Sequence, residues 1–162
     1  MVVKVGIFID AANIYKPDTP VNYRELLKFA EEVGDVIRAN VYLLVDPDNL
    51  QKSRPFVDSL RAMGYKVVEK PFKKTPDGPV KTSITTDLAV DCMLQSDKLD
   101  LIILISGDGD FKSLVKALQS RGKRVEIIAY SDRIAYELRR EADHFTPLEN
   151  IDGIFRRKEG IS

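Results

Sequence analysis

Apolar residues occur along this chain in short runs that are separated by polar or glycine-containing turns. Residues 101–105 are five consecutive aliphatic residues, and such a run without alternation is typical of a strand buried on both faces. Comparable runs predict further strands at 2–9, 36–45, 65–72 and 124–130, with a short sixth strand at 144–146. Between these runs, apolar residues recur at helical spacing and predict helices at about 22–33, 50–63, 86–96, 111–120 and 131–142.

Strands alternate with helices throughout, and this alternation predicts an α/β fold with three layers: a doubly wound, mainly parallel sheet that is covered by helices on both faces. We expect a single domain over residues 1–148. It is followed by a C-terminal tail at 149–162, which has few apolar anchors and a basic cluster. Residues 73–79 are rich in turn formers and are compatible with a hairpin extension.

Residues that start or break helices refine these boundaries. Asn22 is a predicted N-cap of the first helix, Thr85 or Thr86 of the third, and the Ser-Asp pair at 131–132 begins the last. Pro55 lies inside the second predicted helix, where proline removes a backbone hydrogen bond, and it therefore counts against that helix.

Composition narrows the class of protein. Lys and Arg number 25 and so do Asp and Glu, and this zero net charge argues against nucleic-acid binding through bulk charge while still allowing a basic face beside an acidic pocket. Cys92 is the single cysteine, so an internal disulfide is impossible. No apolar run approaches membrane-spanning length, and residues 1–10 are too short and end too acidically for a signal peptide. We therefore expect a cytoplasmic protein without a membrane partner.

Five aspartates lie where the predicted elements end or begin. Asp10 closes the first strand, and Asp108 and Asp110 follow the fourth. Asp87 and Asp91 are four residues apart in a predicted helix, so they share a face of it. In open α/β sheets ligands bind beyond the carboxyl ends of the strands. If the first and fourth strands are neighbours, these carboxylates are expected to converge there.

Converging carboxylates cannot all stay ionised without compensation, and a divalent cation supplies it. Oxygen ligands alone favour Mg²⁺ or Mn²⁺ over zinc. A cation held there would acidify a water molecule, which could attack a phosphodiester without a catalytic His, Cys or Ser. Each aspartate taken singly is equally compatible with a helix cap or a turn, and only their joint placement favours a metal site.

Four segments match a known family: residues 8–15, 86–91, 106–111 and 138–145. On these segments the sequence resembles a LabA-like NYN domain of the PIN-like nuclease superfamily, and the resemblance extends over residues 3–148. It implies a PIN-like sheet of order 3-2-1-4-5 and a Mg²⁺- or Mn²⁺-dependent ribonuclease that hydrolyses RNA.

The resemblance also implies which residues form the site. The implied metal-binding carboxylates are Asp10, Asp87, Asp91, Asp108 and Asp110, and all but Asp91 are also implied to be catalytic. Asn13 matches the asparagine that follows the family's first aspartate, and it would orient metal or phosphate. Ser106 matches the small hydroxyl residue that precedes the family's acidic turn.

Other residues are candidates for contact with substrate. Tyr15 follows the Asp10 motif and could stack on a base. Lys74 and Lys81, together with Lys70 and Lys73, flank the turn-rich loop and could grip phosphates, although a solvated loop explains these lysines equally well. The expected partner is single-stranded RNA. A homodimer is a further option, because a second subunit could add a basic surface to the acidic cleft.

Two other functions stay open from the sequence. One is a non-catalytic module that binds RNA or a nucleotide and regulates a partner, which a compact domain of zero net charge allows. The other is a phosphatase of the haloacid dehalogenase type, which also uses an aspartate after its first strand. Those enzymes carry a second aspartate two residues later, and Ala12 occupies that position here, which disfavours this alternative.

Overall fold

The computed structural model describes residues 2–156 and contains a six-stranded sheet in which every neighbouring pair of strands is parallel. The strands are β1 (Lys4–Asp10), β2 (Asp35–Val45), β3 (Lys66–Pro71), β6 (Leu101–Ile105), β7 (Arg124–Ala129) and β8 (His144–Pro147). Their order in space is β3-β2-β1-β6-β7-β8. The expected order 3-2-1-4-5 is therefore confirmed, and the short sixth strand extends the sheet at the β7 edge.

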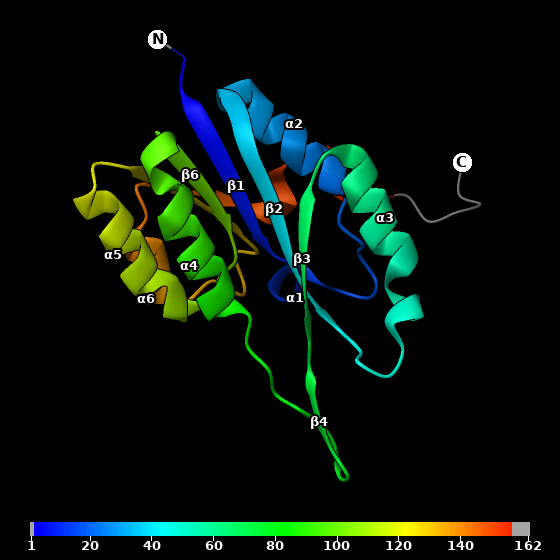
Figure 1. Ribbon diagram of the computed structural model, residues 1–162. Helices are drawn as coiled ribbons and strands as arrows, with labels where there is room; N and C mark the ends of the chain where they lie inside the picture. The colour runs from blue at the N-terminus through cyan, green and yellow to red at the C-terminus, as the bar shows by residue number, and fades with distance from the viewer. Residues whose placement is uncertain (1, 157–162) are drawn as a thin grey trace.

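Helices cover both faces of this sheet, as expected for a doubly wound fold. They are α1 (Ala11–Ile14), α2 (Tyr23–Val33), α3 (Arg54–Met63), α4 (Thr85–Gln95), α5 (Lys112–Ser120) and α6 (Tyr136–Glu141). Helices α2 and α3 lie on one side of the sheet, and α4, α5 and α6 lie on the other (Figure 1). Alternation along β1 serves both layers, because Ile7 and Ile9 are buried with Leu26 of α2 while Phe8 is buried with Leu88 of α4.

Three predicted helix starts differ from those in the structure. Pro55 does not interrupt a helix, since α3 begins at Arg54 and proline is tolerated in a first turn. Helix α4 has Ile84 rather than a threonine as its N-cap, and the amide of Thr85 donates to the Ser83 hydroxyl instead. Helix α6 begins at Tyr136, later than predicted, and residues 131–135 form a turn. The predicted cap Asn22 is confirmed, because its side-chain oxygen accepts the backbone N–H of Arg24 at 3.1 Å.

The chain after β8 packs onto the domain. Ile154 is only 2% exposed, and Phe155 forms an antiparallel bridge with Val21. The Phe155 ring also stacks on Tyr130, with 6.4 Å between ring centroids and 7° between planes. The expectation of a loose tail is therefore wrong for residues 149–156, while 157–162 lie outside the described residues. The buried Ile154 side chain, the bridge to Val21 and the ring stack on Tyr130 hold this short segment on the domain.

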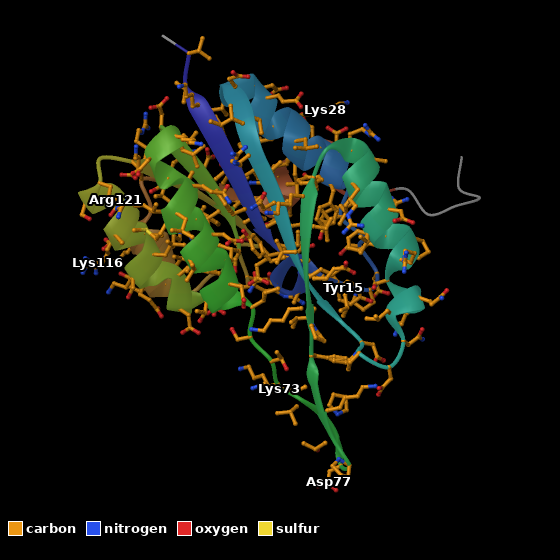
Figure 2. The ribbon with its side chains drawn as sticks, viewed as in Figure 1. Tyr15, Lys28, Lys73, Asp77, Lys116 and Arg121 are labelled. Carbon is orange, nitrogen blue, oxygen red and sulfur yellow. The ribbon has the colours of Figure 1, made fainter. Side chains whose placement is uncertain are left out.

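A two-stranded hairpin projects beyond the carboxyl ends of the central strands. It consists of β4 (Lys73–Thr75) and β5 (Gly78–Val80), which pair antiparallel. Figure 1 shows that it extends away from the sheet, and Asp77 marks its tip in Figure 2. The predicted hairpin extension is thus confirmed. In the part of the chain that the structure describes, every helix is too short or too polar to cross a bilayer.

The packing of the C-terminal segment leads to a stability prediction. We expect Ile154→Ala to destabilise the fold by about 2–5 kcal/mol, because it removes buried methyl groups and leaves a cavity. Urea unfolding measures the change. The matched control is Val90→Ala, at an exposed position on α4, which should change stability by less than ~0.5 kcal/mol. Equal unfolding midpoints for the two variants would mean that the segment contributes nothing to the core.

Candidate functional site

The carboxyl ends of β1 and β6 lie side by side at the centre of the sheet. Ile9 pairs with Ile105 in this parallel ladder, so Asp10 and Ser106 leave the two strands at the same level. The first and fourth strands of the parallel sheet are therefore neighbours, as the predicted acidic site required. This is the edge at which open α/β sheets bind their ligands.

Ser106 connects the two acidic segments. Its hydroxyl donates to Asp10 Oδ2 at 3.1 Å and accepts the backbone N–H of Asp108 at 3.2 Å. Asp108 in turn uses Oδ1 to accept the Asp110 amide at 2.9 Å, which shapes the turn into α5. Ser106 is fully buried and Asp10 is 5% exposed. A single hydroxyl group thus fixes the first predicted carboxylate relative to the backbone of the second.

Asn13 of α1 supports the same turn, and Arg133, from the turn before α6, holds the end of α1. The side-chain oxygen of Asn13 accepts the Gly107 amide at 2.8 Å. Arg133 donates from Nη1 to the carbonyl oxygens of Asn13 and Tyr15, at 3.3 and 3.1 Å. The predicted role of Asn13 was to orient metal or phosphate, whereas its amide oxygen here holds the acidic turn in place.

Gly107 is required at this turn because the neighbouring backbone approaches closely. A Cβ atom at this position would lie 2.8 Å from the carbonyl oxygen of Arg133, which is closer than real Cβ contacts. The Gly107 carbonyl also accepts the amide of Ala135 at 2.9 Å. The segment before α6 therefore packs directly against the acidic turn, and a side chain at position 107 would push the two apart.

Burial and charge both disfavour ionisation of Asp10. Removal from water raises the pKa of its carboxyl above the ordinary value, and the negative charge of Asp108 raises it further. Hydrogen bonds from Ser106 and from the backbone of Asn13 lower the pKa without cancelling the effect of burial. In the described part of the chain, no neighbouring positive charge contributes to the pKa of Asp10, and a bound cation would compensate its negative charge.

The two aspartates of α4 have other partners. Asp87 Oδ2 forms an ion pair with Lys70 Nζ at 2.8 Å, and Lys70 also donates to the carbonyl of Ser83. Asp91 Oδ2 accepts the hydroxyl of Tyr42 at 2.9 Å. Burial raises the pKa of that hydroxyl far above its usual range, and Asp91 raises it further, so Tyr42 stays protonated and donates.

The structure therefore gathers only part of the predicted metal site. Asp10 and Asp108 come together through Ser106, whereas Asp87 and Asp91 each bind a different side chain and Asp110 is exposed. Within residues 2–156, no three His, Cys, Asp or Glu side chains are close enough to chelate an ion. Asp87 and Asp91 are instead engaged by side chains of β3 and β2.

The predicted substrate-binding residues have different environments. Lys74 is engaged by Asp46 at 2.8 Å and Asp48 at 3.0 Å, so it braces the hairpin against the end of β2. These carboxylates raise its pKa. Lys81 is exposed directly after β5, and the Tyr15 side chain is 66% exposed at the end of α1. Lys81 and Tyr15 are thus accessible to a ligand, whereas Lys74 is already paired.

Sequence reasoning missed Tyr42 and Arg133. Strand periodicity places Tyr42 in β2, but nothing in the sequence links it to Asp91, which lies 49 positions away. Arg133 lies 120 positions from the Asn13 carbonyl that it contacts. Such contacts follow from the packing of whole elements, and the sequence carried no signal for either of them.

Comparisons with known proteins agree with this architecture. The NYN domain family matches residues 4–149. The low amplitude and bright protein LabA of Synechococcus elongatus is 24% identical over 166 residues, which covers 96% of this chain and 89% of that protein. An uncharacterised protein of Methanocaldococcus jannaschii is 21% identical over 87% of this chain and 53% of its own length. A crystal structure of a Vibrio parahaemolyticus protein of unknown function superposes with a TM-score of 0.83 at 27% identity, over 96% of this chain and 97% of the other.

The raised pKa of Asp10 predicts a stabilising substitution. Above its raised pKa, the ionised and buried carboxylate costs stability relative to the unfolded chain. We expect Asp10→Asn to raise the melting temperature at pH 7, because the amide is uncharged and keeps an oxygen that can accept the Ser106 hydroxyl. Calorimetry as a function of pH measures the change.

The pH dependence and a matched variant provide the controls. The advantage of Asp10→Asn should shrink as pH falls and disappear below 3.8, the ordinary pKa, because Asp10 is then protonated in both the folded and the unfolded chain. Asp110→Asn changes an exposed carboxylate and should bring no comparable gain. A loss of stability for Asp10→Asn at pH 7 would contradict the electrostatic account of this site.

Proposed function

This chain belongs to the NYN domain family, within the PIN-like nuclease superfamily, and we propose that it is a Mg²⁺- or Mn²⁺-dependent ribonuclease acting on single-stranded RNA. The observation that carries the proposal is the pair of carboxylates at the ends of neighbouring parallel strands. The buried Ser106 hydroxyl links the Asp10 carboxylate to the backbone N–H of Asp108 there. Burial and Asp108 disfavour the ionised form of Asp10, and a bound cation would stabilise that form.

Two carboxylates suit the proposed ion. Mg²⁺ in proteins is usually held by one or two carboxylates, several waters and the phosphates of the substrate. Asp10 and Asp108 would hold the ion, with Asp110 beside them, and the Lys70 and Tyr42 contacts would have to loosen for Asp87 and Asp91 to join. A bound ion would contribute Lewis acidity and lower the pKa of a water molecule. The ligands present are oxygen atoms, which Mg²⁺ and Mn²⁺ both accept.

The surrounding residues would keep this pair in place. The Ser106 hydroxyl restrains Asp10 on one side and the backbone of Asp108 on the other. Asn13 restrains the Gly107 amide between them. These buried contacts would position the carboxylates before substrate arrives, which reduces the cost of ordering them during reaction.

The hairpin would provide positive charge for the RNA backbone. Lys70 at the end of β3 and Lys74 in the hairpin are both held in ion pairs. Lys73 and Lys81 are exposed at the base of the hairpin, where Lys73 pairs in register with Val80. We propose that these two lysines contact phosphates, which explains how a chain of zero net charge could bind RNA locally.

The Lys70–Asp87 ion pair favours a second candidate function. An ammonium group already neutralises this carboxylate at 2.8 Å, so Asp87 has no need of a metal ion. A site with fewer ligands could bind RNA without cleaving it. The alternative is therefore a non-catalytic RNA- or nucleotide-binding regulatory module on the same fold.

Hydrolysis of single-stranded RNA distinguishes the two functions. We expect cleavage with Mg²⁺ or Mn²⁺ that stops when a chelator is added. Asp10→Asn and Asp108→Asn should each lower the rate by ~100-fold or more, since each removes a charged ligand of the proposed metal ion. Labelled oligonucleotides resolved on denaturing gels give these rates.

The matched control is Asp77→Asn at the hairpin tip, away from the carboxyl ends of β1 and β6 (Figure 2). It should cleave as fast as the unsubstituted protein. RNA binding with no cleavage by any of these proteins would instead support the regulatory module.

The proposed phosphate contacts lead to a prediction about salt. Replacing Lys73 and Lys81 together with alanine should weaken RNA binding and reduce the slope of log affinity against log salt by about 0.7 for each lost contact. Fluorescence anisotropy at several salt concentrations measures this slope. Lys28→Ala, on α2 at the other end of the molecule in Figure 2, should leave the slope unchanged. An unchanged slope in the double variant would exclude the hairpin from the RNA path.

A further inference from the structure

A cavity of about 470 Å³ opens beside α1, directly after Asp10. Its size falls within the range of small-ligand pockets. Its aromatic walls are the rings of Tyr15, Tyr23 and Phe56, and Leu43 of β2 adds apolar surface. The acidic pair does not account for a pocket with aromatic walls, and the residues that line the pocket indicate what it binds.

The pocket and the acidic pair share one support. Ala11 and Ala12 line the cavity and directly follow Asp10 in the chain. At about 1.5 Å of rise per residue, the short helix α1 places Tyr15 roughly 6–8 Å along the chain axis from Asp10. This separation matches about two nucleotides of a stacked strand, which advances ~3.4 Å per nucleotide. A strand with a phosphate at Asp10 could therefore place a nearby base in the cavity.

The walls of the cavity are held rigidly, whereas one ring is accessible. Tyr23 packs edge to face on Phe56 and Tyr65, with centroid distances of 5.4 and 6.1 Å. The Tyr65 hydroxyl also donates to the Tyr23 carbonyl at 2.7 Å. Tyr15 has its carbonyl held by Arg133, yet its side chain is 66% exposed. An exposed aromatic ring on a fixed backbone is suited to stacking on a ligand.

The charges around the cavity favour an anionic ligand. Two cationic residues, Lys16 and Arg156, line it, and no acidic residue does so among the described residues. Lys16 also forms an ion pair with Asp132 at 3.6 Å, a contact with an exposed carboxylate that an anionic ligand could replace. An apolar peptide or a lipid chain would gain nothing from these cations. A flat aromatic ring that carries a phosphate uses both the rings and the charges of the pocket.

We infer that this cavity receives a nucleobase of the RNA whose backbone reaches the Asp10–Asp108 pair. The inference rests on the proposed function for the identity of that strand, but not for the pocket's preference for a base. Stacking on tyrosine tolerates any base, because every base has a π-face. The pocket would thus position the strand without selecting its sequence.

Binding of small nucleotides to the full chain in a chelator tests the inference without any cleavage. The probes are AMP and ribose 5-phosphate, followed by NMR of the aromatic side chains. We expect AMP to shift the signals of Tyr15, Tyr23 and Phe56, and to bind about ten-fold more tightly than ribose 5-phosphate, which lacks the base.

Substitutions at one exposed ring sharpen the test. Tyr15→Ala should weaken AMP binding by about ten-fold, whereas Tyr15→Phe should retain it, because stacking needs the ring and not the hydroxyl. Tyr136→Ala removes an equally exposed tyrosine from α6, outside the cavity, and should have no effect. Melting temperatures of all three variants establish that each is folded.

The outcomes separate this inference from the proposed nuclease. Equal binding of AMP and ribose 5-phosphate, or unchanged AMP binding by Tyr15→Ala, overturns the inference even if RNA is cleaved. AMP binding that depends on Tyr15 supports it even if no cleavage is ever detected. AMP that leaves the signals of Tyr15, Tyr23 and Phe56 unshifted also overturns the inference.

Discussion

The parallel pairing of β1 with β6 is the constraint on which the candidate site depends. The register that aligns Ile9 with Ile105 ends both strands at one level, so the Ser106 hydroxyl reaches Asp10 at 3.1 Å. Side chains alternate across a strand, and a slip of one residue would turn Asp10 toward the opposite layer of helices. The apolar residues of these strands are buried on both faces and make such a slip costly. Core packing thereby fixes the polar groups that follow it.

Negative charge at this edge of the sheet is balanced unevenly. Lys70 neutralises Asp87, and the protonated Tyr42 hydroxyl satisfies Asp91. Among the described residues, Asp10 receives hydrogen bonds from Ser106 and the Asn13 backbone, while burial and Asp108 oppose its ionisation. The electrostatic cost is thus concentrated at one buried carboxylate. A site that binds a cation must keep negative charge that the protein itself does not neutralise. The resulting loss of folding stability is common at functional sites.

Helix α1 couples the acidic pair to the aromatic cavity. It is only four residues long, and Arg133 holds the carbonyl oxygens of Asn13 and Tyr15 at its end. The segment that contains Arg133 also packs against Gly107, whose carbonyl accepts the Ala135 amide. One set of backbone contacts therefore supports both features. In the proposed function, an RNA strand would run from the cavity across the carboxylates toward the exposed lysines of the hairpin.

The sequence by itself determined the strands, most helices, their alternation and the placement of Asp10 and Asp108 at strand ends, because periodicity and turn residues are local properties. The strand order came from the resemblance to NYN domains and is confirmed by the sheet. Only the tertiary structure decided that Asp87 meets Lys70, that Asp91 meets Tyr42 and that residues 149–156 pack onto the domain. These contacts join residues far apart in the chain, and their geometry depends on how whole elements pack. Local pattern carries no information about that packing, which is why the carboxylates could be located but their partners could not.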